Sequence, residues 1–248
     1  MTRNDLRKQG QEMRTRLGMD AAKEALPGYA DLSAEAVYGG IWSRPNLPMW
    51  DRMVCALSAL CVLQRLAELK PMIGAALDNG LTARNVLEVF LQSGLYAGFG
   101  TTEAACGVAR EVFASRDVSV PDEPPRDAGN EALDAAAVEV MAEVHGDRAH
   151  KGYAEPGNEI TGALYGAAQR YGYGELWTRP GLDKRQRMLC ALASFTVMSL
   201  EGQLRKFSQS ALNVGLSRDE VVEAVIQTAP YGGFPRALNG LAILSEVF

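Results

Sequence analysis

The stretch IWSRPNLPMWDRMVCAL (residues 41–57) recurs as LWTRPGLDKRQRMLCAL at residues 176–192. The shift between the two is 135 positions, and it stays constant, without a gap, from residues 42–113 to residues 177–248. Of the 72 paired positions, 24 hold identical residues. A fixed internal period of this kind marks a duplicated structural unit. The chain is therefore one unit present twice.

Each unit also has its own lead-in segment. RTRLGMDAAKEAL (residues 14–26) resembles AEVHGDRAHKGYA (residues 142–154) at a different shift, 128 positions. Between the units, residues 119–131 are rich in Pro, Asp and Glu, which is typical of an exposed linker. We therefore expect a first repeat over residues 1–118, a linker over 119–131 and a second repeat over 132–248.

The patterning within each unit is helical. Apolar residues in the run 53–62 recur at a helical spacing, and the run is too long for a strand. Gly80 and Gly215 are typical helix stops, and Thr82 and Ser217 follow them as N-caps of the next helix. The sequence predicts an all-α fold in which two helical units pack as a pseudo-dimer about a pseudo-twofold axis.

Composition and charge exclude several classes of protein. The net charge of −5 provides no basic field for a phosphate backbone, so we expect no nucleic-acid partner. The N-terminus is charged throughout, and no stretch reaches about 18 consecutive apolar residues, so we expect no membrane partner and a cytoplasmic location. The cysteines lack C-x-x-C spacing and lie among apolar residues, which favours buried free thiols over disulfides or zinc ligands.

Longer motifs resemble the carboxymuconolactone decarboxylase family. In the second unit these are YGYGELWTRPGLDKRQR (residues 171–187) and ALNVGLSRDEVVEAVIQTAPYGGFP (residues 211–235); in the first they are YGGIWSRPNLPMWDR (residues 38–52) and ALDNGLTARNVLEVFLQSGLYAGF (residues 76–99). The resemblance implies a tandem helical bundle of the alkylhydroperoxidase D type. It also implies a homo-oligomer, which tandem chains could form as a trimer. It also implies decarboxylation without a metal or organic cofactor.

The sequence departs from that family at its proton donor. The family decarboxylases carry a His before the A-L-x-N-G corner, where this chain has Met72 and Phe207. Relatives with a Cys-x-x-Cys pair are thiol peroxidases, but Cys55 and Cys190 lie singly on apolar helix faces, which makes a peroxidase the least favoured alternative.

Charged residues in apolar surroundings are the shared site candidates. Arg52 and Arg187 open apolar helices, where each needs either an ion pair with Glu88 or Glu223 or a substrate carboxylate or enolate oxygen. Burial would favour the neutral form of Glu88 and Glu223 and make them usable acids or bases, unless they only pair with Arg.

Other candidates come from the tyrosines and from differences between the units. Tyr96 and Tyr231 precede a Gly-rich break. The hydroxyl of each tyrosine either donates a hydrogen bond to a developing oxyanion of the substrate or belongs to a residue that packs in the core. Glu175, His150 and Arg236 occur in the second unit alone, which favours a working pocket there. The catalytic candidates are Glu175, Arg187, Glu223, Tyr231 and His150, and the substrate-binding candidates are Trp177, Cys190, Phe207, Arg236, Arg52, Met72, Glu88 and Tyr96.

Taken together, the residues and the resemblance predict a cofactor-independent lyase or isomerase acting on a small lactone, enol or keto acid, in a tailoring role in secondary metabolism. The histidines, five residues apart and without a third ligand nearby, predict no metal site. The alternative is a non-catalytic binding or scaffold protein that kept the fold and lost the acid.

Overall fold

The computed structural model describes residues 2–19, 26–120, 122, 126–155 and 157–248, and within these residues it is helical without a strand. The first unit contains α1 (Arg3–Arg16), α2 (Tyr29–Ser33), the π-helix η1 (Ala34–Trp42), α3 (Met49–Val62), α4 (Leu66–Asp78), α5 (Ala83–Ala97) and α6 (Phe99–Ser115). The second contains α7 (Asn130–His145), η2 (Gly146–Arg148), η3 (Gly152–Ala154), α8 (Glu159–Ala167), the π-helix η4 (Ala168–Glu175), η5 (Leu176–Thr178), α9 (Lys184–Met198), α10 (Glu201–Ala211), η6 (Leu212–Val214), α11 (Arg218–Gln227), α12 (Ala229–Gly232) and α13 (Phe234–Val247).

The predicted corner between the two middle helices of each unit is confirmed. Gly80 and Gly215 adopt φ values of 96° and 87°, a left-handed region that a residue with a Cβ enters only at a cost. Thr82 and Ser217 then cap α5 and α11 with reciprocal capping boxes. Local sequence therefore sets where each of these helices begins.

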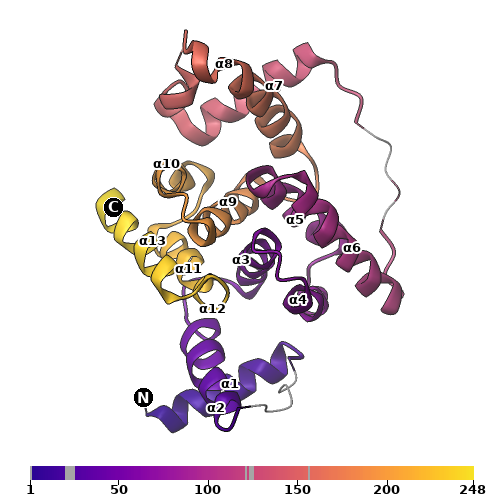
Figure 1. The fold of residues 1–248 in the computed structure, drawn as a ribbon, viewed down its shortest axis with the longest axis vertical. Coiled ribbons are helices and arrows are strands. Elements are labelled where there is room, and N and C mark those ends of the chain that lie inside the picture. The colour runs from indigo at the N-terminus through magenta and orange to yellow at the C-terminus, as the bar shows by residue number, and fades with distance from the viewer. Residues whose placement is uncertain (1, 20–25, 121, 123–125, 156) are drawn as a thin grey trace.

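The two units share one core at the centre of the molecule. α3 and α9 pack against each other, and residues 51–61 and 187–197 are buried on every side of these helices. α5 of the first unit packs on α9, and α11 of the second unit packs on α3 (Figure 1). The tandem pseudo-dimer is thus confirmed, with each unit contributing to the surroundings of the other.

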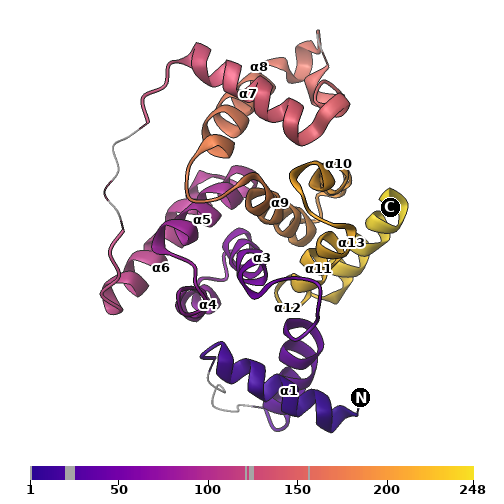
Figure 2. The same cartoon turned by 180° about the vertical axis from the view of Figure 1, so that it is seen from behind.

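The lead-in helices lie at opposite ends of the molecule. Figure 2 shows α1 below the core and α7 with α8 above it, each packed on the π-helix of its own unit. Glycines allow these close crossings, because a Cβ at Gly39 or Gly174 would stand 2.4 or 2.2 Å from the carbonyl oxygen of Leu6 or Leu133. The position of α7, and of every side chain on it, therefore depends on Gly174.

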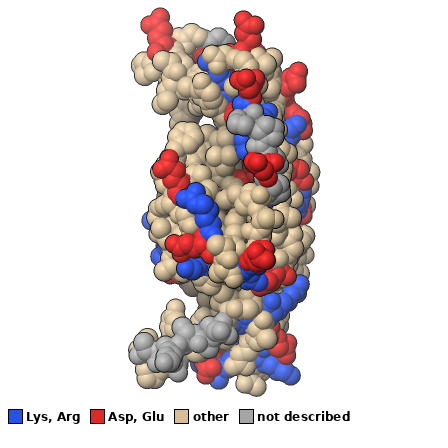
Figure 3. Space-filling view, turned by 90° about the vertical axis from the view of Figure 1, so that its right-hand side faces the viewer, with Lys and Arg blue, Asp and Glu red and all other residues tan. Residues whose placement is uncertain are grey.

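The segment between the units runs from the end of α6 to the start of α7, residues 116–129. Residues 121 and 123–125 of the predicted linker lie outside the described residues, so its boundaries stay a prediction. Among the described helices, none is long and apolar enough to cross a membrane. On the face drawn in Figure 3, acidic and basic side chains are interspersed, without a continuous patch of one sign.

Candidate functional site

Four polar side chains form a buried cluster, here called the Glu88 cluster: Glu88, Gln92, Arg179 and Arg187. Arg187 Nη2 donates to Glu88 Oε2 at 2.9 Å and Nη1 donates to Gln92 Oε1 at 3.0 Å. Arg179 Nε donates to Glu88 Oε1 at 2.9 Å. Arg187 is 0% and Glu88 2% exposed, so these charges compensate one another away from solvent.

A second cluster repeats this arrangement at the equivalent positions of the other unit. The Glu223 cluster consists of Glu223, Gln227, Arg44 and Arg52. Arg52 Nη2 lies 3.1 Å from Glu223 Oε2, and its Nη1 donates to Gln227 Oε1 at 2.8 Å. Arg44 Nη2 donates to Glu223 Oε1 at 2.7 Å. The ion pairs expected as one role for these arginines are thus confirmed.

The arginines of each cluster come from one unit and the carboxylate comes from the other. This corrects the grouping expected for a pocket in the second unit, because Arg187 lies with Glu88 whereas Glu223 lies with Arg52. Glu223 pairs with two guanidinium groups, and Glu88 pairs with three, because Arg84 Nε also donates to Glu88 Oε1 at 3.2 Å. Both carboxylates are therefore counter-ions of buried arginines.

Of the two predicted tyrosines, Tyr96 lies beside the Glu88 cluster. Gln92 Nε2 donates to Tyr96 Oη at 2.8 Å, and Tyr96 packs edge-on against Phe195 with ring centroids 4.6 Å apart. Burial raises the pKa of both Tyr96 and Tyr231, so both remain phenols at neutral pH. Tyr231 lies beside Trp42 of the first unit.

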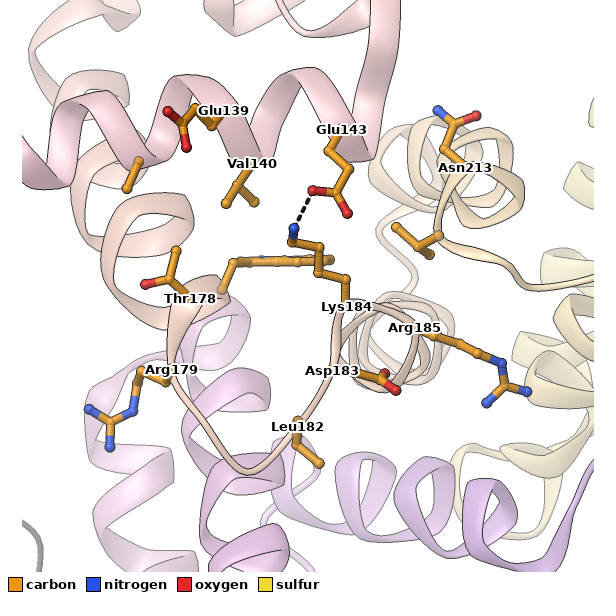
Figure 4. Close-up of a pocket in the computed structure, with 13 residues that line it drawn as sticks. Glu139, Val140, Glu143, Thr178, Arg179, Leu182, Asp183, Lys184, Arg185 and Asn213 are labelled. Atoms are coloured by element: carbon orange, nitrogen blue, oxygen red, sulfur yellow. Dashed lines mark hydrogen bonds and ion pairs between the residues drawn. The ribbon is translucent and has the colours of Figure 1, made fainter.

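A groove of about 800 Å³ opens at the surface beside the Glu88 cluster. Figure 4 shows α7 along one side, with Glu139, Val140 and Glu143, and the segment leading into α9 along the other. Arg179 lines the groove and also belongs to the Glu88 cluster, and its side chain is 25% exposed. Lys184 bridges the groove by an ion pair with Glu143. Arg179 therefore links the edge of the groove to the buried carboxylate of Glu88.

His145 is buried at the C-terminal end of α7, 1% exposed, with both ring nitrogens bonded. Its Nε2 lies 2.7 Å from Tyr173 Oη and its Nδ1 lies 2.8 Å from Ser210 Oγ. Burial, with Lys206 and Arg148 nearby, lowers the pKa of His145 to about 3. The imidazole is therefore neutral at physiological pH.

Aromatic rings enclose this histidine. The ring centroid of Phe207 lies 5.0 Å from that of His145, and that of Tyr173 lies 5.5 Å from it. Trp177 stacks on Tyr173 at 5.9 Å and also lines the groove. His145 therefore stands directly beside Phe207, the position at which the family resemblance leads one to expect a histidine.

The two histidines differ in burial, and the role predicted for His150 stays a prediction. His150 is exposed on the segment after η2, away from the buried rings, whereas His145 lies among them. A signal was present in the lead-in match, since the shift of 128 pairs His145 with Leu17, which is 1% exposed. A polar residue at a position that is apolar in the other repeat indicates a specific role.

The remaining candidates divide by location. Glu175 lies at the edge of the Glu88 cluster, with Oε1 3.4 Å from Arg179 Nη1. Arg236 is exposed and donates to the carbonyl oxygen of Val197 at the end of α9, so it serves that helix end rather than the cluster. Met72 is buried in the core of the first unit. Burial raises the pKa of Cys190 to about 12, which leaves it a thiol.

Among the described residues there is no group of three or more His, Cys, Asp or Glu side chains placed to hold a metal ion.

Comparison with known proteins agrees with this architecture. The chain is 29% identical to the 4-carboxymuconolactone decarboxylase of Acinetobacter baylyi over 111 residues, which cover 45% of this chain and 83% of that protein. It is 29% identical to the nitrosuccinic acid decarboxylase of Metarhizium robertsii over 94 residues, 38% of this chain and 61% of that protein. Both relatives are therefore matched by less than half of the tandem chain.

A solved structure from Burkholderia xenovorans, described as a candidate gamma-carboxymuconolactone decarboxylase subunit, shares the fold. It superposes with a TM-score of 0.54 and 20% identity, over 100% of this chain and 98% of that one. The sequence profile of the carboxymuconolactone decarboxylase family matches residues 27–111 and again residues 162–246. The chain therefore belongs to the carboxymuconolactone decarboxylase family, as a member that carries the family unit twice.

Proposed function

We propose that this protein is a cofactor-independent carbon–carbon lyase of the decarboxylase type, acting on a small oxygenated acid such as a β-keto acid or a carboxylated enol or lactone. The observation that carries the proposal is the position of Arg179, which belongs to the buried Glu88 cluster and lines the groove of about 800 Å³. Two relatives that are named decarboxylases support the reaction class.

Arg179, at the edge of a groove that also holds Glu139, Glu143 and Asp183, would offset the negative charge that a decarboxylation develops. The bond to the carboxylate carbon breaks, its electron pair moves into the conjugated carbonyl group, and CO2 leaves an enolate that takes up a proton on carbon. Arg179 would bind the carboxylate or the enolate oxygen, held in place by Glu88 and Glu175. If instead a base removes a proton from carbon and the resulting enolate is protonated at another carbon, the carboxylate is retained and the enzyme is an isomerase.

A non-catalytic binding protein is the second candidate. The observation that favours it is the pair Met72 and Phe207, both buried and apolar, at the positions where the family decarboxylases carry a histidine. A binding protein would retain the groove and its affinity for acids and would leave them unchanged.

The test compares two equivalent arginines. Arg179→Gln and Arg44→Gln each remove one guanidinium group from a buried carboxylate, but only Arg179 lines the groove. Purified protein is incubated with a panel of β-keto acids and carboxylated lactones, and CO2 release is measured. We expect R179Q to lower kcat/KM by about 10-fold or more, the loss of one charged contact, and R44Q to leave it unchanged.

Two outcomes would contradict the proposal. Equal activity of R179Q and R44Q would show that the groove does not take part in the reaction. Saturable binding of a panel acid by wild-type protein, without CO2 release or rearrangement, would establish the binding protein instead.

A further inference from the structure

We propose that Arg148 and Lys206 form a phosphate-binding site between η2 and α10. Arg148 lies in η2, directly after α7, and Lys206 lies in α10, which packs against α7 (Figure 1). Neither residue lines the groove, so this site is separate from the one proposed for the lyase activity and goes beyond it.

A buried serine holds Arg148 beside the helix that carries Lys206. Ser210 is 0% exposed, and its Oγ donates to the carbonyl oxygen of Lys206 at 3.0 Å. Arg148 Nη2 donates to this Oγ at 3.0 Å, and His145 Nδ1 lies 2.8 Å from it. Because the single hydroxyl hydrogen serves the carbonyl oxygen, Ser210 accepts from both side chains. The guanidinium group is therefore anchored through one of its nitrogen atoms.

The two cations lack anionic partners. Among the described residues neither Arg148 nor Lys206 forms an ion pair, and Asp147, the acidic residue next to Arg148, pairs with neither. Arg148 Nε is buried without a hydrogen-bond partner, and both side chains are half-buried. Burial and the charge of Arg148 lower the pKa of Lys206, and burial and both cations lower the pKa of His145. Like charges held together in this way favour the binding of an anion.

The amount of charge selects the ligand. The carbonyl oxygens at the C-terminal end of α7 carry about half a unit of negative charge, which is less than two cations require. His145 is neutral and does not change this balance. A carboxylate supplies one negative charge, whereas a phosphate group carries about 1.5 to 2 at neutral pH and has several acceptor oxygens. A phosphate group can therefore neutralise both cations, with each bonded to a different oxygen.

The first unit lacks this arrangement. At the shifts of 128 and 135 positions, Arg148, Lys206 and Ser210 correspond to residues that provide neither a cation nor a hydroxyl group: Asp20, Pro71 and Ala75. The duplicated fold is therefore formed without these side chains, and the site is specific to the second unit.

The experiment titrates the full chain with inorganic phosphate by calorimetry, at constant ionic strength. Arg148→Gln and Lys206→Gln each remove one charged contact, so we expect each to weaken phosphate binding by about 10-fold. The matched control is Arg205→Gln, which removes a neighbouring cation on α10 that is paired with Glu246. We expect R205Q to bind phosphate as wild type does. Acetate, with a single charge, should bind wild type more weakly than phosphate does.

A second probe distinguishes free phosphate from a phosphate ester. Tyr153 is 61% exposed, and Gln203, one turn before Lys206 on α10, donates to Tyr153 Oη at 3.4 Å. An aromatic ring carried by the ligand would thus meet Tyr153 beside the cations. Tighter binding of phenyl phosphate than of inorganic phosphate, with the gain lost in Tyr153→Leu, would identify an aromatic ester as the ligand. Equal binding of the two probes would identify free phosphate.

Acetylation of wild-type protein gives a measurement that needs no variant. The lowered pKa of Lys206 leaves more of it as the reactive free amine, and bound phosphate would raise this pKa and cover the amine. Phosphate should therefore slow the reaction of Lys206 with acetic anhydride. Lys8, exposed on α1 at the opposite end of the molecule, should react at the same rate with and without phosphate. Mass spectrometry gives both rates.

Three results would overturn the inference. The first is the lack of saturable phosphate binding by wild type. The second is equal weakening of binding by R148Q, K206Q and R205Q, which would indicate general screening of positive charge. The third is acetylation of Lys206 at a rate that phosphate does not change. None of these measurements uses turnover, so each outcome leaves the proposed lyase activity to its own test.

Discussion

His145 is a buried base whose protonation opposes folding. Its pKa falls from an ordinary value of 6.5 to about 3 in the folded chain, mainly through burial. The unfolded chain therefore takes up a proton below pH 6.5 and the folded chain does not. Stability is fully present above pH 6.5 and is lost as the pH falls from 6.5 towards 3, by about 1.4 kcal/mol per pH unit.

This linkage predicts a difference between wild type and His145→Leu. Between pH 7 and pH 5.5 the free energy of unfolding of wild type should fall by about 1 kcal/mol more than that of H145L, because only wild type can protonate this site. Urea unfolding at the two pH values measures both. Parallel pH dependence of the two proteins would show that His145 is not buried in its neutral form.

The buried cysteines are expected to react slowly with alkylating reagents. Burial raises the pKa of Cys61 and Cys190 to about 12 and that of Cys55 well above its usual range, and the thiolate is the reactive form. Iodoacetamide at pH 8 should therefore label native Cys106, which is partly exposed, before the other three. Mass spectrometry after brief labelling checks this, with urea-unfolded protein as the fully labelled control. Rapid labelling of native Cys190, together with thiol-dependent peroxide consumption, would instead favour a peroxidase.

At the scale of elements, the crossing of α7 over η4 places His145. A methyl group at Gly174 would press on the carbonyl oxygen of Leu133 in α7, and one at Gly39 would press on that of Leu6 in α1. Gly174→Ala and Gly39→Ala should each lower the free energy of unfolding by about 1–3 kcal/mol, the usual cost of overpacking.

The two variants should differ in activity. G174A displaces α7, whose Val140 and Glu143 line the groove, so we expect a lower kcat at temperatures where the protein is fully folded. G39A displaces α1 at the opposite end of the molecule and should leave kcat unchanged. Circular dichroism establishes the folded fraction and CO2 release gives the rate. A kcat reduced equally by both variants would mean that general destabilisation, rather than the position of α7, controls the activity.

At the scale of the whole molecule, buried ion pairs join the two units. Removing one partner of such a pair leaves an uncompensated charge, so Arg187→Met and Glu88→Gln should each lower the free energy of unfolding by about 3–5 kcal/mol. In a double-mutant cycle these two changes should couple by at least 1 kcal/mol, because the groups are in contact.

The control cycle pairs Arg187 with Glu223, the equivalent carboxylate of its own unit. Arg187→Met and Glu223→Gln act on different clusters and should be additive within about 0.5 kcal/mol. Both cycles are measured by urea unfolding. Coupling of Arg187 to Glu223 rather than to Glu88 would contradict the cross-unit arrangement.

Much of the architecture followed from local sequence. The repeat, the all-α class and the corners at Gly80 and Gly215 were predictable, because capping and left-handed glycines act over a few residues. The need of Arg52 and Arg187 for buried partners was predictable too, since the cost of desolvating a charge does not depend on which partner offsets it.

Only the tertiary structure decided which carboxylate each arginine meets and which histidine is buried. Glu88 and Glu223 hold the same position in the repeat, so the sequence is equally compatible with pairing within a unit and across the pseudo-twofold axis. The packing of α5 on α9 and of α11 on α3 makes the choice. The burial of His145 likewise depends on how α7 crosses η4. The spacing of apolar residues along the chain does not reveal that these two segments pack against each other.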